Sequence, residues 1–208
     1  MKTASIITVI SMTTAFAQGA TENFDGAKPG TLPAGWVSGV TGSGTPRWLV
    51  ESDSAAASPP HVLKQSGKGT FPWCVKQDAS LADGYVEVKL KPLTGREDQA
   101  GGVVWRWKDH DNYYVARANA LENNVSLYYT QNGRRITLKY VDAPVARNAW
   151  HGLRVEFSGK KIRVIFDGKP TIEMEDDHIA GSGAVGVWTK ADSVTLFDDF
   201  NYGALSGP

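Results

Sequence analysis

The sequence predicts an all-β protein with the architecture of a sandwich or a barrel. Short segments rich in β-branched and aromatic residues recur at a spacing of roughly ten residues, and Gly, Pro and Asp turn signals separate them. No window keeps the i, i+3, i+4, i+7 apolar spacing of an amphipathic helix. The sequence also has no repeat of fixed period, which argues against a propeller or a solenoid.

Residues 1–17 are predicted to be a secretory signal peptide. Lys2 precedes a short apolar run, and the run ends in the small-x-small pattern Ala-Phe-Ala at 15–17. A membrane anchor is the alternative, but the run is too short and too rich in Thr and Ser to cross a bilayer comfortably. We therefore expect residues 18–208 to form one exported domain in the periplasm or the extracellular medium, with no membrane span.

Composition narrows the possible partners. The 22 basic and 22 acidic residues balance, so nothing indicates the strongly basic surface that favours nucleic acid. Cys74 is the only cysteine, so no intrachain disulfide can form, and a buried inert thiol is expected there. The domain must therefore be held together by its hydrophobic core, for which the chain is long enough.

The chain before residue 84 is expected to contain long loops and few strands. Gly and Pro punctuate residues 21–36, where Phe24 and Trp36 are expected to anchor the segment. Residues 37–46 and 52–60 are rich in small polar residues and are predicted to be loops. Short strands are expected at 47–51, at 61–65 and around Cys74.

From residue 84 the alternation becomes regular. Val86, Val88 and Leu90 share one face of the strand predicted at 84–91, and Pro92 ends it. Three strands are expected within 101–129. Further strands are predicted at 134–141, 150–157, 161–166, 171–175, 184–188 and 193–197, with an Asp-Gly hairpin turn between the third and fourth of these. A short helical turn is expected at 175–180.

Six segments, taken in order, carry a resemblance to a known family. They are residues 101–106, 112–117, 150–154, 166–168, 186–190 and 197–200. The set resembles the concanavalin A-like lectin/glucanase jelly rolls, and within them the laminin-G-like and 3-keto-disaccharide hydrolase-like domains of secreted bacterial proteins, over about residues 24–202. The resemblance implies a two-sheet antiparallel jelly-roll sandwich whose concave sheet offers a groove for sugars. Lectins, hydrolases, lyases and inert interaction domains share this fold, so it does not decide the activity.

The central strands carry the candidate sugar-binding residues. In the strand predicted at 112–119, Arg117 and Asn119 share a face with Tyr113, whereas small residues and Tyr114 on the other face suit packing against the second sheet. Aromatic rings stack on the C–H faces of sugars, while amide and guanidinium groups bond to hydroxyls. The predicted ligand-binding residues are Trp105, Arg106, Tyr113, Arg117, Asn119, Trp188, Lys190 and Asp192.

Each of these residues also has a purely structural interpretation. The aromatic residues would then fill the core, and Arg117 would pair with a carboxylate such as Glu122. Lys190 and Asp192 would form an ion pair in a turn. Trp105 and Trp107 are expected to share a face of their strand, opposite Arg106.

Evidence for catalysis is weaker. The laminarinase-type members of the resembled superfamily carry Glu-x-Asp-x-x-Glu on one strand, and this sequence lacks that motif. The acidic residues at 173–177 are mis-spaced and are interpreted as a solvated charged edge. His151 is expected to be exposed, without a partner that the sequence shows. Whether the protein is an enzyme is therefore open. Glycan recognition is the leading function, with a hydrolase of sugar derivatives and a structural or protein-interaction domain as alternatives.

A structural calcium ion is the one cofactor that the sequence suggests. Asp25 lies near the mature start and Asp199 near the end of the chain, and the termini of a single sandwich domain often lie close together. Carboxylates and backbone carbonyls are the oxygen ligands that Ca²⁺ prefers. Hydrogen bonds to nearby backbone N–H groups are the alternative role for these residues. No other cofactor is expected.

Overall fold

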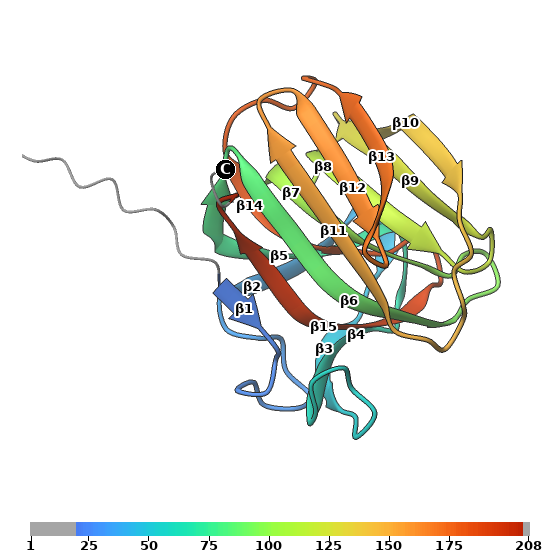
Figure 1. The fold of residues 1–208 in the computed structure, drawn as a ribbon. Coiled ribbons are helices and arrows are strands. Elements are labelled where there is room, and N and C mark those ends of the chain that lie inside the picture. The colour runs from blue at the N-terminus through green and yellow to red at the C-terminus, as the bar shows by residue number, and fades with distance from the viewer. Residues whose placement is uncertain (1–19, 206–208) are drawn as a thin grey trace, which may run out of the picture.

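The fold is seen in a computed structural model that describes residues 20–205, so the predicted signal peptide at 1–17 lies outside the described residues. Two antiparallel β-sheets pack face to face as layers (Figure 1), in agreement with the predicted jelly-roll sandwich. No helix long and apolar enough to cross a membrane occurs within this range.

Sheet 1 has eight strands and sheet 2 has seven. In spatial order, sheet 1 contains β13 (Lys169–Glu175), β12 (Lys161–Phe166), β11 (His151–Ser158), β6 (Gly84–Thr94), β15 (Val194–Gly203), β4 (His61–Gln65) and β3 (Trp48–Ser52), with β1 (Ala20–Glu22) also paired to β15. Sheet 2 contains β10 (Arg134–Asp142), β9 (Asn124–Gln131), β8 (Asn112–Asn119), β7 (Ala100–Asp109), β14 (Gly183–Trp188), β5 (Lys68–Leu81) and β2 (Trp36–Thr45).

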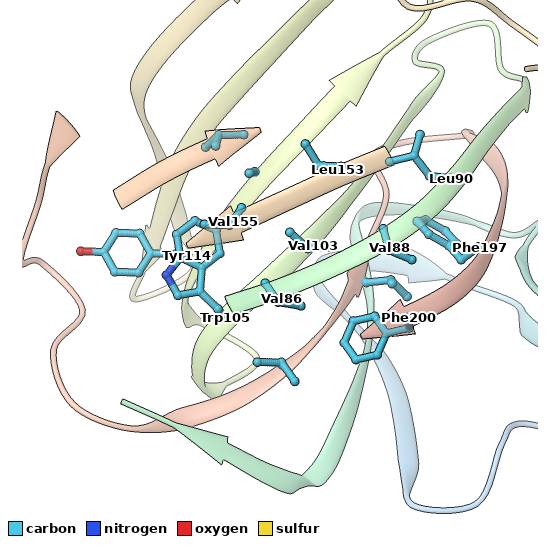
Figure 2. Packing of buried hydrophobic residues seen from close by; sticks show 14 of the residues in the cluster. Val86, Val88, Leu90, Val103, Trp105, Tyr114, Leu153, Val155, Phe197 and Phe200 are labelled. Atoms are coloured by element: carbon cyan, nitrogen blue, oxygen red, sulfur yellow. The ribbon is translucent and has the colours of Figure 1, made fainter. Parts of the chain in front are cut away.

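The main core lies between the two sheets. Val86, Val88 and Leu90 of β6 are fully buried in it, as the alternation predicts (Figure 2). Trp105 of β7 lies in the same core, where its ring stacks on that of Tyr114 at a centroid distance of 5.2 Å. Burying apolar surface of this extent supplies the main stabilisation of a domain without disulfides.

Strand β8 follows the predicted alternation. Tyr114, Ala116 and Ala118 point into the core between the sheets. Tyr113 and Arg117 therefore lie on the outer face of sheet 2, because successive side chains of a strand alternate between faces. A site built on the predicted residues Tyr113 and Arg117 would therefore lie on the outer face of sheet 2.

Strand β7 departs from the prediction at Arg106. Its φ angle is +47°, and its pairing with β8 shifts register between Trp105 and Asp109. The bulge breaks the period of two, since it adds a residue to one strand. Trp105 consequently stays in the core, while Trp107 packs on the outer face, so the expectation that they share a face is wrong.

Two further expectations are corrected. Residues 37–46, predicted to be a loop, lie almost entirely in β2, which pairs with β5 at the sheet edge. Edge pairing needs backbone groups rather than apolar side chains. A Cβ at Gly39 would lie 2.5 Å from the Trp73 ring, so any larger residue there would displace that ring. The helical turn expected at 175–180 is absent, because residue 175 ends β13 and residues 176–180 are irregular with a bend at 178–179.

Candidate functional site

The outer face of sheet 2 is strongly concave. Thr41 of β2 shares a hydrogen bond of 2.8 Å with the hydroxyl of Tyr113 in β8, although three strands separate β2 from β8 in the sheet. The guanidinium of Arg135 in the edge strand β10 lies 4.7 Å from the ring centroid of Phe71 in β5. Side chains from the two halves of the sheet therefore meet above its centre.

A second hydrophobic cluster fills one end of this concave face. It contains Trp73, Val75, Val104, Tyr113, Val115, Tyr128 and Trp188. Tyr113 and Trp188 are fully buried, so neither offers an open ring to a ligand. Their predicted role as a sugar platform is corrected: the structural interpretation holds, because the curvature of the sheet closes over them.

Two other predicted ligand-binding residues do not reach this face. Trp105 is buried between the sheets. Arg106 donates hydrogen bonds to the carbonyls of Ala82 at 3.0 Å, Ile179 at 3.2 Å and Gly159 at 2.7 Å. These bonds tie loops together at one end of the sandwich. The bulge in β7 redirects the Arg106 side chain and is the reason the prediction is wrong.

Beyond the hydrophobic cluster the concave face carries an ionic network centred on Arg117. Its Nη1 donates to both carboxylate oxygens of Asp98 at 3.1 Å, and its Nη2 donates to Glu122 at 2.7 Å. Its Nε donates to the hydroxyl of Tyr128 at 3.2 Å. The predicted pair with Glu122 is confirmed. Lys190 pairs with Asp98 at 2.8 Å, rather than with Asp192 as expected.

The network holds Arg117 and Glu122 in their charged forms. Burial would lower the pKa of Arg117, but the charge of Asp98, followed by Tyr128 and Glu122, more than offsets this, and the pKa is raised. Burial would likewise raise the pKa of Glu122, but hydrogen bonds from Asn124 and Arg117 and the nearby cations hold it below its usual value. Glu122 is therefore a carboxylate near neutral pH.

Two buried asparagine side chains, Asn119 and Asn124, lie next to Glu122. The Oδ1 of Asn119 accepts the backbone N–H of Leu121 at 2.9 Å and so shapes the turn that carries Glu122. The Nδ2 of Asn124 donates to Glu122 at 3.0 Å and also to the hydroxyl of Tyr140. Tyr140 is 48% exposed and is the open aromatic ring of this polar region.

A groove runs beside the network between β10 and the ends of β2 and β5. Its volume is about 650 Å³, inside the range of roughly 300–1,000 Å³ that is common for small-ligand sites. Phe71, Arg135 and Lys190 line it. Arg135 lies over the rings of Tyr128 and Phe71, with its guanidinium 4.3 Å from the Tyr128 centroid.

Asp192 has a supporting role. Its carboxylate accepts backbone N–H groups of Arg96 at 2.9 Å, Glu97 at 2.9 Å and Asp98 at 3.2 Å. Burial opposes ionisation, but these three bonds outweigh it and lower the pKa of Asp192. Asp192 thus holds the loop that presents Asp98 to Arg117.

His151 differs from its expected exposure. It is buried, with Nδ1 at 2.8 Å from Asp167 and Nε2 at 2.9 Å from the carbonyl of Ala146. Both ring nitrogens are engaged by these groups, which tie β11 to neighbouring turns. The ring therefore has no free nitrogen with which to act as a general base.

The expected calcium ligands serve as hydrogen-bond acceptors. Asp25 accepts the backbone N–H of His61 at 3.1 Å, and Asp199 accepts the hydroxyl of Ser58 at 2.7 Å. Within residues 20–205 no three His, Cys, Asp or Glu side chains are grouped to hold a metal ion. The calcium expectation is therefore not supported, and the hydrogen-bonding alternative accounts for both carboxylates.

Asp198, beside these residues, should make stability depend on pH. Burial, with smaller contributions from the charges of Asp199 and Asp25, raises its pKa to about 6. An unfolded Asp titrates near 3.9, so the stabilisation from the protonated form is complete below about pH 4 and is lost as the pH rises through about 6. The wild type should therefore lose up to about 3 kcal/mol relative to Asp198→Asn over this window.

Urea unfolding of both proteins between these pH values, in the presence of EDTA, measures this difference. The exposed Asp142→Asn substitution is the control and should leave the pH profile unchanged. A stability difference between wild type and Asp198→Asn that stays constant with pH would contradict the assignment.

Sequence reasoning missed three residues of this region: Asp98, Arg135 and Tyr140. Asp98 follows Gly95 in a charged turn, which is typical of solvent-exposed loops. Arg135 and Tyr140 lie on an edge strand, where polar residues usually protect the edge. A bulge at Leu138 lies between Arg135 and Tyr140 and breaks the period of two. The local pattern therefore does not show that these two residues share a face.

Comparisons with known proteins bear on the fold. No protein-family model and no curated protein sequence matches the chain. The carbohydrate-binding module CBM66 from Bacillus subtilis superposes with a TM-score of 0.68 at 20% identity, over 82% of this chain and 96% of that one. A Bacillus licheniformis β-glucanase superposes with a TM-score of 0.58 at 13% identity, over 93% and 100% of the two chains.

A β-1,3-1,4-glucanase (lichenase) from a mouse hindgut metagenome gives a TM-score of 0.59 at 13% identity, over 89% of this chain and 98% of that one. At such identities the likeness speaks for the fold and not for the activity. The protein therefore has a two-sheet antiparallel jelly-roll sandwich fold like that of these structures.

Proposed function

We propose that this protein binds a glycan on the polar part of its concave face and does not hydrolyse it. The observation that carries the proposal is the Arg117 network. The Arg117 side chain is 3% exposed and that of Asp98 is fully buried. Replacing such a buried ion network with apolar side chains is often neutral or stabilising, so stability alone does not account for it. Its position beside an exposed ring and a groove suits ligand recognition.

The surface atoms of the region suit a polyhydroxylated ligand. The Tyr140 ring offers a face for the C–H groups of a sugar. Glu122 supplies carboxylate acceptors for hydroxyl groups, and Lys190, whose side chain is 29% exposed, supplies ammonium donors. Arg117 and Asp98 lie beneath and hold these groups in place. The structural likeness to a carbohydrate-binding module supports the same interpretation.

The ionisation of the region argues against glycoside hydrolysis. Such catalysis needs two carboxyl groups, of which one must carry a proton for the leaving group. Glu122 has a lowered pKa and so holds no proton near neutral pH. Asp98 is fully buried, and Arg117 and Lys190 occupy its oxygens. Glu122 therefore cannot act as the acid, and the buried Asp98 is not accessible to a substrate.

Tyr140→Ala should weaken glycan binding by about tenfold, because the stacking surface is lost. Ile136→Ala is the matched control, since Ile136 is an exposed apolar residue on the same strand. A glycan array followed by affinity electrophoresis on the glycans that bind measures both variants against wild type. Equal binding by the Tyr140 and Ile136 variants would contradict the proposed site. A protein that binds no glycan would favour a structural or protein-interaction role.

We also propose that the domain works outside the cytoplasm. The support is the predicted signal peptide at 1–17. N-terminal sequencing of the protein from periplasmic and medium fractions should give a start near Gln18. An N-terminus that retains Lys2 in these fractions would contradict cleavage.

A further inference from the structure

A second hollow adjoins the groove beside the network. It has a volume of about 330 Å³ and is lined by Arg96, Arg147 and Lys68. Lys68 lines the groove as well, so the two hollows share a wall. The second hollow lies beyond the end of the concave face, where Thr94 of β6 and Val194 of β15 also line it, and the two hollows together are called the depression.

The depression is markedly cationic. Five basic side chains line it, against the two carboxylates of Asp192 and Glu97. The basic residues are Lys68, Arg96, Arg135, Arg147 and Lys190. The carboxylate of Asp192 is already occupied by three backbone N–H groups. Since the whole chain carries no net charge, this concentration is a local feature and not a property of the composition.

Most of these cations are not neutralised within the protein. Only Lys190 among the five has a carboxylate within 4.0 Å in the part of the chain that the structure describes. Lys68, Arg96 and Arg147 are exposed at the rim. Clefts lined by one sign of charge concentrate ligands of the opposite sign.

Arg135 is the most constrained of the cations. Its guanidinium lies over three aromatic rings, at 4.3 Å from the centroid of Tyr128, 4.7 Å from Phe71 and 5.7 Å from Trp188. These contacts fix its plane, yet its buried Nη1 has no hydrogen-bond partner among residues 20–205. Arg135 also lines the groove, so a carboxylate or sulfate bound there would meet its guanidinium, whose planar fork suits such groups.

We infer that the two hollows bind an acidic saccharide, with a carboxylate or sulfate group of the sugar on Arg135. The inference rests on the proposed glycan-binding function and names the class of glycan. The Phe71 ring and the hydroxyls of Ser43 and Thr45 line the same groove, and they suit the C–H faces and hydroxyls of a sugar ring. Further acidic groups along the saccharide would then contact Lys68, Arg96 and Arg147.

Calorimetric titration with trigalacturonate and with its methyl ester tests the inference, because the two probes differ in charge and share a sugar backbone. The free acid should bind at least tenfold more tightly, and its advantage should shrink as salt is added. Arg135→Gln should remove that advantage. Arg134→Gln removes the same charge from the preceding, exposed position and should keep it.

Two further variants protect the test against a folding defect at Arg135. Arg135→Lys keeps the charge without the planar fork, and should retain part of the preference. The double variant Arg96→Gln/Arg147→Gln removes two exposed cations. It should weaken binding of the free acid several-fold while leaving the affinity for the methyl ester unchanged.

The outcomes separate this inference from the proposed function. Equal affinity for acid and ester, or equal losses in the Arg134 and Arg135 variants, would overturn the inference. If neutral glycans bind and Tyr140→Ala weakens their binding, the proposed function holds even where the inference of an acidic saccharide fails. Binding of no glycan of either kind removes both. Displacement of trigalacturonate by an equal concentration of inorganic sulfate would also overturn it, by showing that the depression takes a small anion alone.

Discussion

Replacing Trp188 by alanine is expected to lower the free energy of unfolding by about 3–5 kcal/mol, as for a large aromatic residue in a core. Trp188 lies on the outer face of its sheet, yet it is fully buried, and its ring stacks on Phe71 at a centroid distance of 5.7 Å. The substitution would leave a cavity under Arg135, whose guanidinium covers the ring. Urea unfolding of the ligand-free protein measures the loss.

The same experiment decides between packing and ligand recognition at this position. Tyr140→Ala is the comparison, because Tyr140 is an aromatic residue on the same face with an exposed ring. It should change stability by less than about 1 kcal/mol. If Trp188→Ala were equally mild, the ring would not be part of a core, and its predicted role as a sugar platform would return.

Arg117→Met is expected to destabilise the protein by about 3 kcal/mol or more. The substitution leaves the carboxylate of Asp98 fully buried, with Lys190 as its remaining cation. Most of the loss is the cost of an incompletely paired buried charge, and it should appear in the urea midpoint without a change in slope.

The double variant Arg117→Met/Asp98→Leu separates charge from packing. Removing both charges should recover much of the stability lost in the single variant, since a well-packed apolar pair replaces the ion pair. Arg163→Met is the control, because Arg163 forms exposed ion pairs that contribute little. A single Arg117 variant as stable as the Arg163 variant would contradict the description of Arg117 as the centre of the network.

The sequence predicts those parts of the fold that local alternation decides. In β6 and β8 the period of two is unbroken, and the residues predicted to face the core do so. In β7 a single bulge at Arg106 reverses the faces of the residues that follow, and no local signal marks it. Strand β2 could not be predicted from the sequence, because its pairing with β5 is long-range and most of its residues are small or polar.

In the candidate site, too, only the contact between residues close in sequence could be predicted. The pair between Arg117 and Glu122 could be predicted because the two residues flank one turn. The partnership of Arg117 with Asp98 depends on a loop held by Asp192, which is distant in sequence. The burial of Tyr113 and Trp188 follows from the curvature of the whole sheet. Curvature is a property of seven strands together, so no single segment reveals it.

The bond between Thr41 and Tyr113 has a consequence for the thermodynamics of recognition. It ties the two halves of sheet 2 together across the concave face, with the hydrophobic cluster packed beneath. A surface braced in this way is already formed before a ligand arrives, so association orders little backbone. The conformational entropy lost on binding then comes mainly from the exposed side chains that contact the ligand.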